Sequence, residues 1–141
     1  MSNLAADRAD LRHLVESYAA ACDGRDLALL QSCFVEGGSL TVHQPGRGPS
    51  TMTTPADLDR VPSGLGRYDH TFHLVGNHRV DIDGDQASGD TYCVAHHVQG
   101  DVDLVIYIRY EDRYQRTDAG WRIATRDVRM LWTSRQPVEP A

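Results

Sequence analysis

Three of the seven histidines of this chain lie between Tyr68 and His78. A histidine side chain titrates at about pH 6.5, so it can accept or release a proton near neutral pH. A carboxylate behind the imidazole would hold it in one tautomer and stabilise its charged form. Asp23 is the candidate, because it ends an apolar helix face where the helix dipole does not favour a negative charge. We therefore expect His73, backed by Asp23, to be a general base in an apolar pocket; a solvated turn aspartate is the alternative reading of Asp23.

Strand alternation adds further candidate site residues. Arg126 is a charged residue among apolar neighbours on one strand face, so it is expected to bind an anionic oxygen, a developing enolate or a leaving halide. A buried acidic partner for Arg126 is the alternative. The predicted substrate-binding residues are Tyr18, Thr91, Cys93, His97, Ile106, Val128 and Met130. Simpler roles stay open for two of them, a core aromatic for Tyr18 and a rim or interface histidine for His97.

Proton transfer of this kind needs no cofactor, and no metal site is expected. His70 and His73 fall on opposite sides of a strand by alternation, as do His96 and His97, so neither pair has the geometry of a metal ligand set. The chain contains neither a CxxC nor an HExxH motif. Its odd number of widely spaced cysteines in apolar patterns indicates buried free thiols, at Cys22, Cys33 and Cys93.

The composition fits one globular domain spanning residues 1–141, with 40% apolar and 24% charged residues. Acidic residues outnumber basic ones by 20 to 14, and the basic residues are scattered along the chain. This pattern argues against nucleic acid or an anionic membrane as the partner. The N-terminal sequence does not resemble a signal peptide, and no apolar run approaches the roughly eighteen residues of a membrane span, so we expect a cytoplasmic protein.

The N-terminal third is predicted to be helical. Apolar residues recur at helical spacing from Leu4 to Cys22. Gly24 is expected as the left-handed residue that ends this helix, and Asp26 as the cap of a second helix that continues to Gly37-Gly38. A short strand, 39–43, and a Pro/Gly-rich loop, 44–50, follow. Thr54-Pro55 then predicts the start of a short helix, broken by Pro62, Gly64 and Gly66, that acts as a lid.

The second half is predicted to be β-structure. Four long runs rich in Val, Ile, Tyr and Thr cover 72–82, 87–98, 104–116 and 121–133, and short Asp/Gly turns separate them. Helices followed by consecutive antiparallel strands indicate an α+β fold in which a curved sheet wraps around the first helix. Such a sheet leaves a cone-shaped cavity between its concave face and the helices, which is a common form of ligand pocket.

Several segments together resemble the SnoaL-like branch of the nuclear transport factor 2-like (NTF2-like) superfamily, and within it the scytalone dehydratase and hexachlorocyclohexane dehydrochlorinase group. They are Asp23-Gly24-Arg25-Asp26, residues 70–77, Gly84-Asp85-Gln86-Ala87, and Tyr114 with Trp121-Arg122-Ile123 and Arg126 beyond. The resemblance covers nearly the whole chain. It implies the cone-shaped, cystatin-like α+β fold, a catalytic pair at Asp23 and His73, and a site arginine at Arg126. Cys22 departs from the tyrosine that scytalone dehydratase-like sequences carry there.

These observations predict a cofactor-independent lyase or isomerase that acts on a small hydrophobic, cyclic molecule by dehydration, dehydrohalogenation or isomerisation. Because one fold can host unrelated functions, two other roles remain open: a non-catalytic small-molecule-binding domain, and a structural partner of a larger oxygenase. Open sheets associate through their outer face, so a homodimer or homotrimer is expected.

Overall fold

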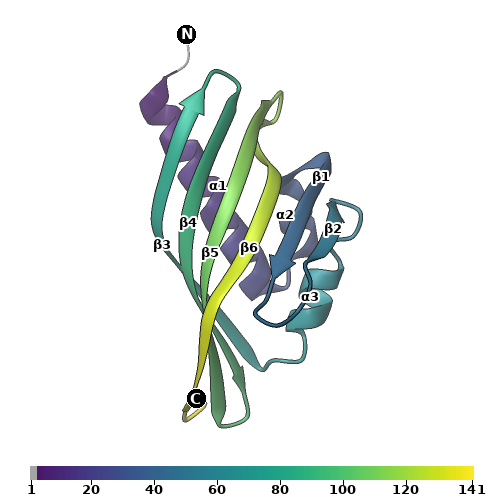
Figure 1. Cartoon of the computed structure of the whole chain (residues 1–141), viewed down its shortest axis with the longest axis vertical. Coiled ribbons are helices and arrows are strands. Elements are labelled where there is room, and N and C mark those ends of the chain that lie inside the picture. Colours follow the sequence, from purple (N-terminus) through teal and green to yellow (C-terminus); the bar gives the residue numbers. More distant parts are fainter. Residues whose placement is uncertain (1–2) are drawn as a thin grey trace.

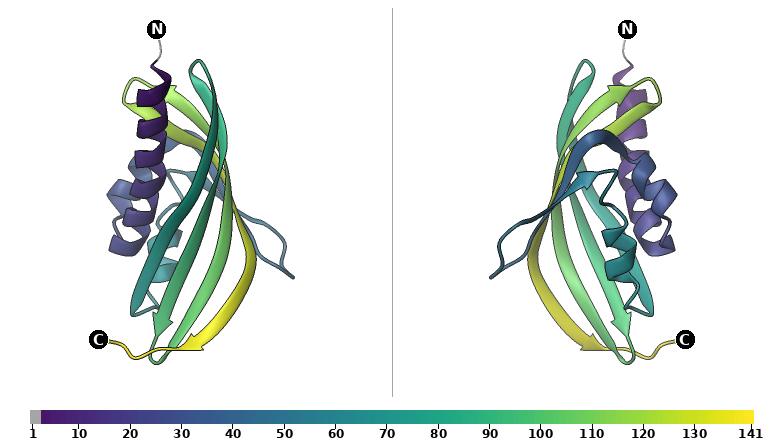
Figure 2. Two further views of the ribbon diagram at one scale, coloured as in Figure 1. Left: turned by 90° about the vertical axis from the view of Figure 1, so that its left-hand side faces the viewer. Right: turned by 90° about the vertical axis from the view of Figure 1, so that its right-hand side faces the viewer.

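A long N-terminal helix lies against the concave side of a six-stranded sheet in the computed structural model, which describes residues 3–141 (Figure 1). The elements in chain order are α1 (Leu4–Gly24), α2 (Leu27–Ser32), β1 (Phe34–His43), β2 (Ser50–Thr54), α3 (Arg60–Leu65), β3 (His70–Asp83), β4 (Gln86–Gln99), β5 (Val102–Thr117) and β6 (Gly120–Pro137). The expected α+β class is confirmed, and the sheet is curved and unclosed, with all three helices on its concave side (Figure 2).

The strands are arranged in the order β2-β1-β6-β5-β4-β3. The four predicted strands β3 to β6 are consecutive and antiparallel, as expected, and β1 joins the sheet by pairing parallel to β6. This register places residues from separate strands in rows across the sheet. One row contains His73, Ala95, Ile106 and Thr133; another contains Asp112 and Arg126. Both rows bear on the candidate site.

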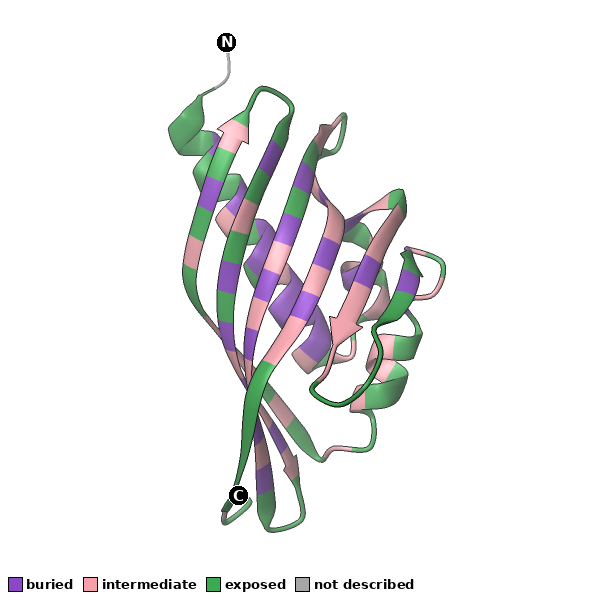
Figure 3. Ribbon diagram, in the orientation of Figure 1, coloured by how far each residue is buried: buried purple, intermediate pink, exposed green. Residues whose placement is uncertain are grey.

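The core lies between α1 and the concave face of the sheet. The helical stripe predicted from the sequence is buried: Leu11, Leu14, Val15, Tyr18 and Cys22. On β4 and β5 buried residues alternate with more exposed ones, as expected for strands with one face on a core (Figure 3). Phe72 and Leu74 are exposed on β3, on the face opposite His73. The expected homodimer or homotrimer stays a prediction.

The end of α1 differs from the expectation in one residue. Arg25, not Gly24, takes the left-handed conformation, with φ 52° and ψ 36°. That conformation is unfavourable for a residue with a side chain. The Arg25 side chain compensates, because Nη1 donates to the carbonyl of Cys22 (2.8 Å) and Nη2 to the carbonyl of Leu65 (3.0 Å). The helix end is therefore tied to α3.

The expectation that α2 continues to Gly37-Gly38 is wrong. Asp26 does cap α2, but the helix ends at Ser32 and β1 begins at Phe34. The two glycines belong to an irregularity in β1, where the pairing with β6 shifts between Phe34 and Ser39. Gly37 has φ 72°, and a Cβ on Gly38 would lie 2.3 Å from the carbonyl oxygen of Ala124. The glycine pair allows β1 to kink and pack closely on β6.

The segment after β1 also differs from the expectation. Residues 50–54 form β2, although Ser50 was expected to end a loop and Thr54 to start a helix. Thr54 donates its hydroxyl to the carbonyl of Val35. The helix begins later, at Arg60, and includes Pro62 and Gly64. Pro62 lies in the first turn, where its missing N–H is not required. Within residues 3–141 no helix has the length and apolar character needed to cross a membrane.

Candidate functional site

Asp23, in the last turn of α1, and His73, on β3, are in direct contact. Asp23 Oδ1 lies 2.6 Å from His73 Nδ1, and Oδ2 accepts the backbone N–H of His73 at 2.8 Å. The side chain of His73 is 6% exposed and that of Asp23 is 29% exposed. With Nδ1 directed at a carboxylate, the ring presents Nε2 on its other side. No group in residues 3–141 forms a hydrogen bond to this nitrogen.

A second layer of hydrogen bonds holds the carboxylate in place. The hydroxyl of Thr71, two residues before His73 on the same face of β3, donates to Asp23 Oδ1 at 3.0 Å. Arg25 Nη1 in turn donates to the Thr71 hydroxyl at 2.7 Å. Arg25, the residue that caps α1, thus orients the Thr71 hydroxyl, which in turn orients the Asp23 carboxylate.

The balance of these contacts keeps Asp23 ionised. Partial burial alone would raise the pKa of Asp23, but hydrogen bonds from the His73 ring, the His73 backbone N–H and Thr71 outweigh burial and lower it. At neutral pH the carboxylate is therefore charged. It is in position to fix the tautomer of a neutral His73 ring and to stabilise a protonated one.

His73 lies in the wall of a cavity of about 650 Å³ on the concave side of the sheet. Most of its lining is apolar and comes from α1, β1, β2, α3, β5 and β6: Tyr18, Cys22, Leu40, Val42, Met52, Val61, Leu65, Leu104, Ile106, Ile108, Tyr110, Val128 and Met130. A cavity of this size suits a small organic ligand. In such surroundings a proton-accepting nitrogen is shielded from water, which strengthens its electrostatic interactions.

His97 and Tyr68 lie in the wall of the same cavity as His73. The rings of His97 and His73 are 5.7 Å apart, and the Tyr68 ring is 4.9 Å from His97. Burial, followed by the nearby His73, lowers the pKa of His97, so this second imidazole is neutral at pH 7. Its Nδ1 lies 3.2 Å from the carbonyl oxygen of Leu104. The cavity therefore holds two histidines in different electrostatic environments.

Arg126 lies beneath the cavity and does not belong to its lining. Its Nε and Nη2 donate to the two carboxylate oxygens of Asp112, each at 2.8 Å, and both side chains are 0% exposed. The guanidinium carbon is 4.3 Å from the ring centre of Tyr18 and 4.0 Å from that of Tyr110. Here the alternative reading from the sequence, a buried acidic partner, describes the observed contacts.

The structure brings most predicted site residues together. Tyr18, His97, Ile106, Val128 and Met130 line the cavity with His73, and Asp23 lies behind the histidine. Thr91 and Cys93 are not among the residues that line it; they are buried on the same face of β4. Alternation gives the face of a strand but not the position along it, so it could not separate these two residues from the cavity lining.

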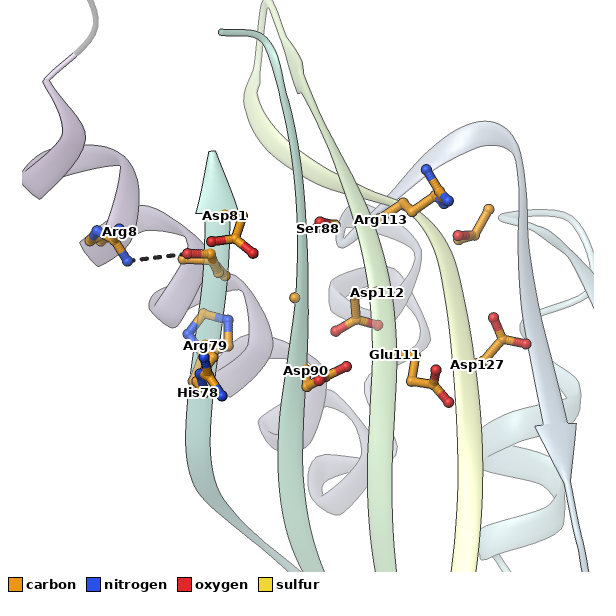
Figure 4. Close-up of a pocket in the computed structure, with 13 residues that line it drawn as sticks. Arg8, His78, Arg79, Asp81, Ser88, Asp90, Glu111, Asp112, Arg113 and Asp127 are labelled. Carbon is orange, nitrogen blue, oxygen red and sulfur yellow. Dashed lines mark hydrogen bonds between the residues drawn. The ribbon is translucent and has the colours of Figure 1, made fainter. Parts of the chain in front are cut away.

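A larger hollow, of about 710 Å³, lies over another part of the sheet and is lined mainly by charged side chains (Figure 4). Three of its carboxylates already have partners: Asp112 pairs with Arg126, Glu111 pairs with Arg129, and Asp127 Oδ1 lies 2.7 Å from His43 Nε2. The hollow offers little apolar surface for an organic ligand.

No cluster of three or more His, Cys, Asp or Glu side chains within residues 3–141 is arranged to hold a metal ion.

Sequence reasoning missed the supporting residues Arg25 and Thr71, the cavity residue Tyr68, and four arginines around the cavity: Arg47, Arg60, Arg67 and Arg135. Tyr68 and Thr71 adjoin the histidines that drew attention to the segment, so proximity in sequence was an available signal. The four arginines come from separate parts of the chain and gave no such signal.

Comparison with known proteins places the chain in a family. A family model described as SnoaL-like domain matches residues 3–127. A Mycobacterium tuberculosis protein named Rv2910c and a Mycobacterium bovis protein named Mb2934c are each 31% identical over 127 residues, which cover 85% of this chain and 82% of theirs.

Solved structures share the fold. A hexachlorocyclohexane dehydrochlorinase, LinA-type3 from Novosphingobium barchaimii, is 22% identical with a TM-score of 0.79, covering 96% of this chain and 92% of that one. A scytalone dehydratase-like protein of Novosphingobium aromaticivorans is 20% identical with a TM-score of 0.81 over 96% and 91%. An NTF2-like protein with a cystatin-like fold from the same organism is 25% identical with a TM-score of 0.75 over 91% and 84%.

Proposed function

Because the chain belongs to the SnoaL-like domain family, we propose that it is a cofactor-independent lyase or isomerase. In this proposal His73 is the general base, and Asp23 is the residue that positions it. The observation that carries the proposal is the 2.6 Å contact between Asp23 Oδ1 and His73 Nδ1, which leaves Nε2 available to the apolar cavity. The dehydrochlorinase among the solved structures with this fold is consistent with elimination chemistry on such a scaffold.

The reaction begins when Nε2 of His73 takes a proton from a carbon next to a carbonyl, or from a carbon β to a leaving group. In an elimination, the electrons of the C–H bond form a carbon–carbon double bond and the leaving group departs with the electrons of its own bond. In an isomerisation, the proton returns to a different carbon. The imidazolium formed in either case lies next to the ionised Asp23, which stabilises it. A general base contributes about a hundredfold to ten-thousandfold in rate.

Neutral donors in the cavity can stabilise the charge that develops on the substrate. Burial raises the pKa of both Tyr18 and Tyr110 well above the ordinary value, so their phenols keep their protons. Tyr68 lines the cavity beside His97 and is a further phenol donor. We assign these groups to substrate binding and polarisation.

Hydrogen–deuterium exchange tests the proposal before the natural substrate is known. Protein in D₂O is mixed with a panel of cyclic ketones and β-chloro or β-hydroxy ketones; NMR follows loss of the α-proton signal, and ultraviolet absorbance follows formation of the enone. We expect exchange or elimination with the wild type and a loss of about a hundredfold or more in His73→Gln. His70→Gln is the matched control, because His70 is exposed on the same strand. Equal rates for wild type and His73→Gln would contradict the assignment of the base.

A further inference from the structure

The cavity that contains His73 has an unusual charge distribution. Its lining includes four arginines, Arg47, Arg60, Arg67 and Arg135, and no aspartate or glutamate. In the chain as a whole the balance is the reverse, with 20 acidic residues and 14 basic ones, a formal charge of −6. The charged hollow shown in Figure 4 has acidic residues from four strands in its lining. Positive charge is thus concentrated at one cavity of an acidic protein.

These four arginines converge from separate elements. Arg47 lies in the loop between β1 and β2, Arg60 begins α3, Arg67 lies between α3 and β3, and Arg135 is near the end of β6. All four are exposed, while the apolar residues Ile108, Tyr110 and Val128 of the same lining are buried. The cavity therefore has an apolar interior and a cationic rim.

The rim arginines are free to bind a ligand. Within residues 3–141 none of the four has a carboxylate within ion-pair distance. Arg67 Nη2 donates to the hydroxyl of Tyr68 at 2.9 Å, and Arg60 Nη2 approaches the hydroxyl of Ser50 at 3.4 Å. A guanidinium presents several N–H donors in a planar fork, which matches a carboxylate or a phosphate in geometry as well as in charge.

From this arrangement we propose that the ligand of this cavity is an amphipathic anion, a small molecule with an apolar body and a carboxylate or phosphate at one end. The apolar body enters the cavity towards His73, and the anionic group stays at the arginine rim. This inference names the substrate class for the proposed general base, and it rests on that proposal only in taking the same cavity as the site. The rim charges also attract such a ligand from solution, an effect that weakens as salt rises.

Three probes with the same aromatic body test the charge preference: 2-naphthoate, 2-naphthyl phosphate and the neutral 2-naphthamide. Isothermal titration calorimetry measures the Kd of each at low and high salt. We expect at least one anion to bind about tenfold or more tightly than the amide, and that preference to shrink at high salt. Whichever anion binds more tightly identifies the carboxylate or the phosphate as the preferred group. Binding of both anions equal to or weaker than that of the amide, including no binding of any probe, would overturn the proposal.

Two matched double variants test whether the rim arginines cause the preference for an anionic ligand. Arg47→Gln/Arg135→Gln removes two rim charges, and Arg79→Gln/Arg113→Gln removes two exposed charges that line the other hollow, so both reduce the net charge equally. We expect the rim variant to lose about fivefold to tenfold in affinity for the preferred anion and less than twofold for the amide, and the control variant to match wild type. Equal losses in both variants would show that only net charge matters and would overturn the rim site.

The His73→Gln variant separates this inference from the proposed function. It should keep the preference for the anion while it loses proton exchange, because the rim arginines bind the ligand independently of the base. In the wild-type protein, proton exchange without any anion preference would refute the substrate class alone. In the wild-type protein, an anion preference without proton exchange would refute the general base alone.

Discussion

The carboxylate of Asp23 contacts His73 at two points, the backbone N–H at 2.8 Å and ring Nδ1 at 2.6 Å. The backbone contact fixes the position of the carboxylate relative to β3, and the ring contact then fixes the orientation of the imidazole. One side chain at the end of α1 therefore determines both where the base lies and which nitrogen faces the cavity.

Replacing Asp23 by asparagine should separate its role in positioning His73 from the effect of its negative charge. An asparagine can still accept the backbone N–H of His73, but it cannot stabilise an imidazolium, so we expect proton exchange to fall by about a hundredfold to ten-thousandfold. The ¹⁵N chemical shifts of the His73 ring should show a protonated Nδ1 in the neutral wild type and a mixture of tautomers in the variant. Unchanged exchange rates together with unchanged ring shifts would show that the contact has no catalytic role.

The pair of Arg126 and Asp112 should behave as a structural unit. Both side chains are fully buried, so Asp112→Asn leaves a charge without its partner and should reduce the free energy of unfolding by about 3–5 kcal/mol. The double variant Asp112→Leu/Arg126→Met removes both charges and should cost less than Asp112→Asn alone. Urea denaturation followed by tryptophan fluorescence measures these values.

A surface ion pair provides the control for that comparison. Arg129 pairs with Glu111, and both side chains are more than a third exposed, so Arg129→Gln should change the free energy of unfolding by no more than about 1 kcal/mol. If Asp112→Asn were as mild as Arg129→Gln, the burial of the Arg126 pair would have no energetic consequence and this account of it would be wrong.

The contact between Asp23 and His73 was predicted from local patterns together with the family resemblance. Helical periodicity placed Asp23 at the end of α1, and the dipole argument marked it as a carboxylate in need of a partner. Its pairing with His73 was what the resemblance implied, because alternation alone does not decide which face of a strand is concave. The acidic partner of Arg126 could not be identified in this way. Glu111 and Asp112 are adjacent, and only the register between β5 and β6, which shifts between Arg113 and Tyr114, places Asp112 opposite Arg126.

The group of arginines at the cavity rim could not be predicted from the sequence, for a related reason. Arg47, in the loop after β1, and Arg135, on β6, line one cavity because β1 pairs parallel to β6, a long-range contact that no local pattern encodes. The kink at Gly37-Gly38 lets β1 pack closely on β6, but from the sequence these two glycines were interpreted as the end of a helix. Local sequence patterns thus predicted most helices and strands, whereas the long-range pairing of strands determines which charged side chains lie around the cavity.

The three cysteines should be unreactive in the folded protein. Burial raises the pKa of Cys22 to about 12 and that of Cys33 and of Cys93 to about 11, so almost no thiolate forms at pH 8. We expect no reaction with Ellman's reagent in native buffer and three thiols per chain in guanidinium chloride. Rapid reaction of any thiol in the native protein would contradict its buried position.

Acid should destabilise the fold through Asp7 on α1. Its carboxylate accepts hydrogen bonds from Arg116 Nη1 (2.7 Å) and Nη2 (2.9 Å) on β5 and from the indole N–H of Trp121 (3.0 Å) on β6. The Arg116 guanidinium, with Trp121, lowers the pKa of Asp7 from 3.8 to about 2. Because the folded pKa lies below the unfolded one, the stabilisation is complete above about pH 4 and is lost as the pH falls to about 2.

Urea denaturation at a series of pH values from 5 to 2 measures this effect. The free energy of unfolding of the wild type should decline through that range, and Asp7→Asn should show a lower value at pH 5 and a shallower decline. Asp23 and Asp103, whose pKa values are also lowered, account for the decline that remains, since burial, which opposes the shift, is outweighed by hydrogen bonds from His73 and His96 respectively. Asp10→Asn, one turn further along α1 and exposed, should retain the wild-type slope. A slope in Asp7→Asn identical to that of Asp10→Asn would mean that the Asp7 to Arg116 pair does not link α1 to the sheet energetically.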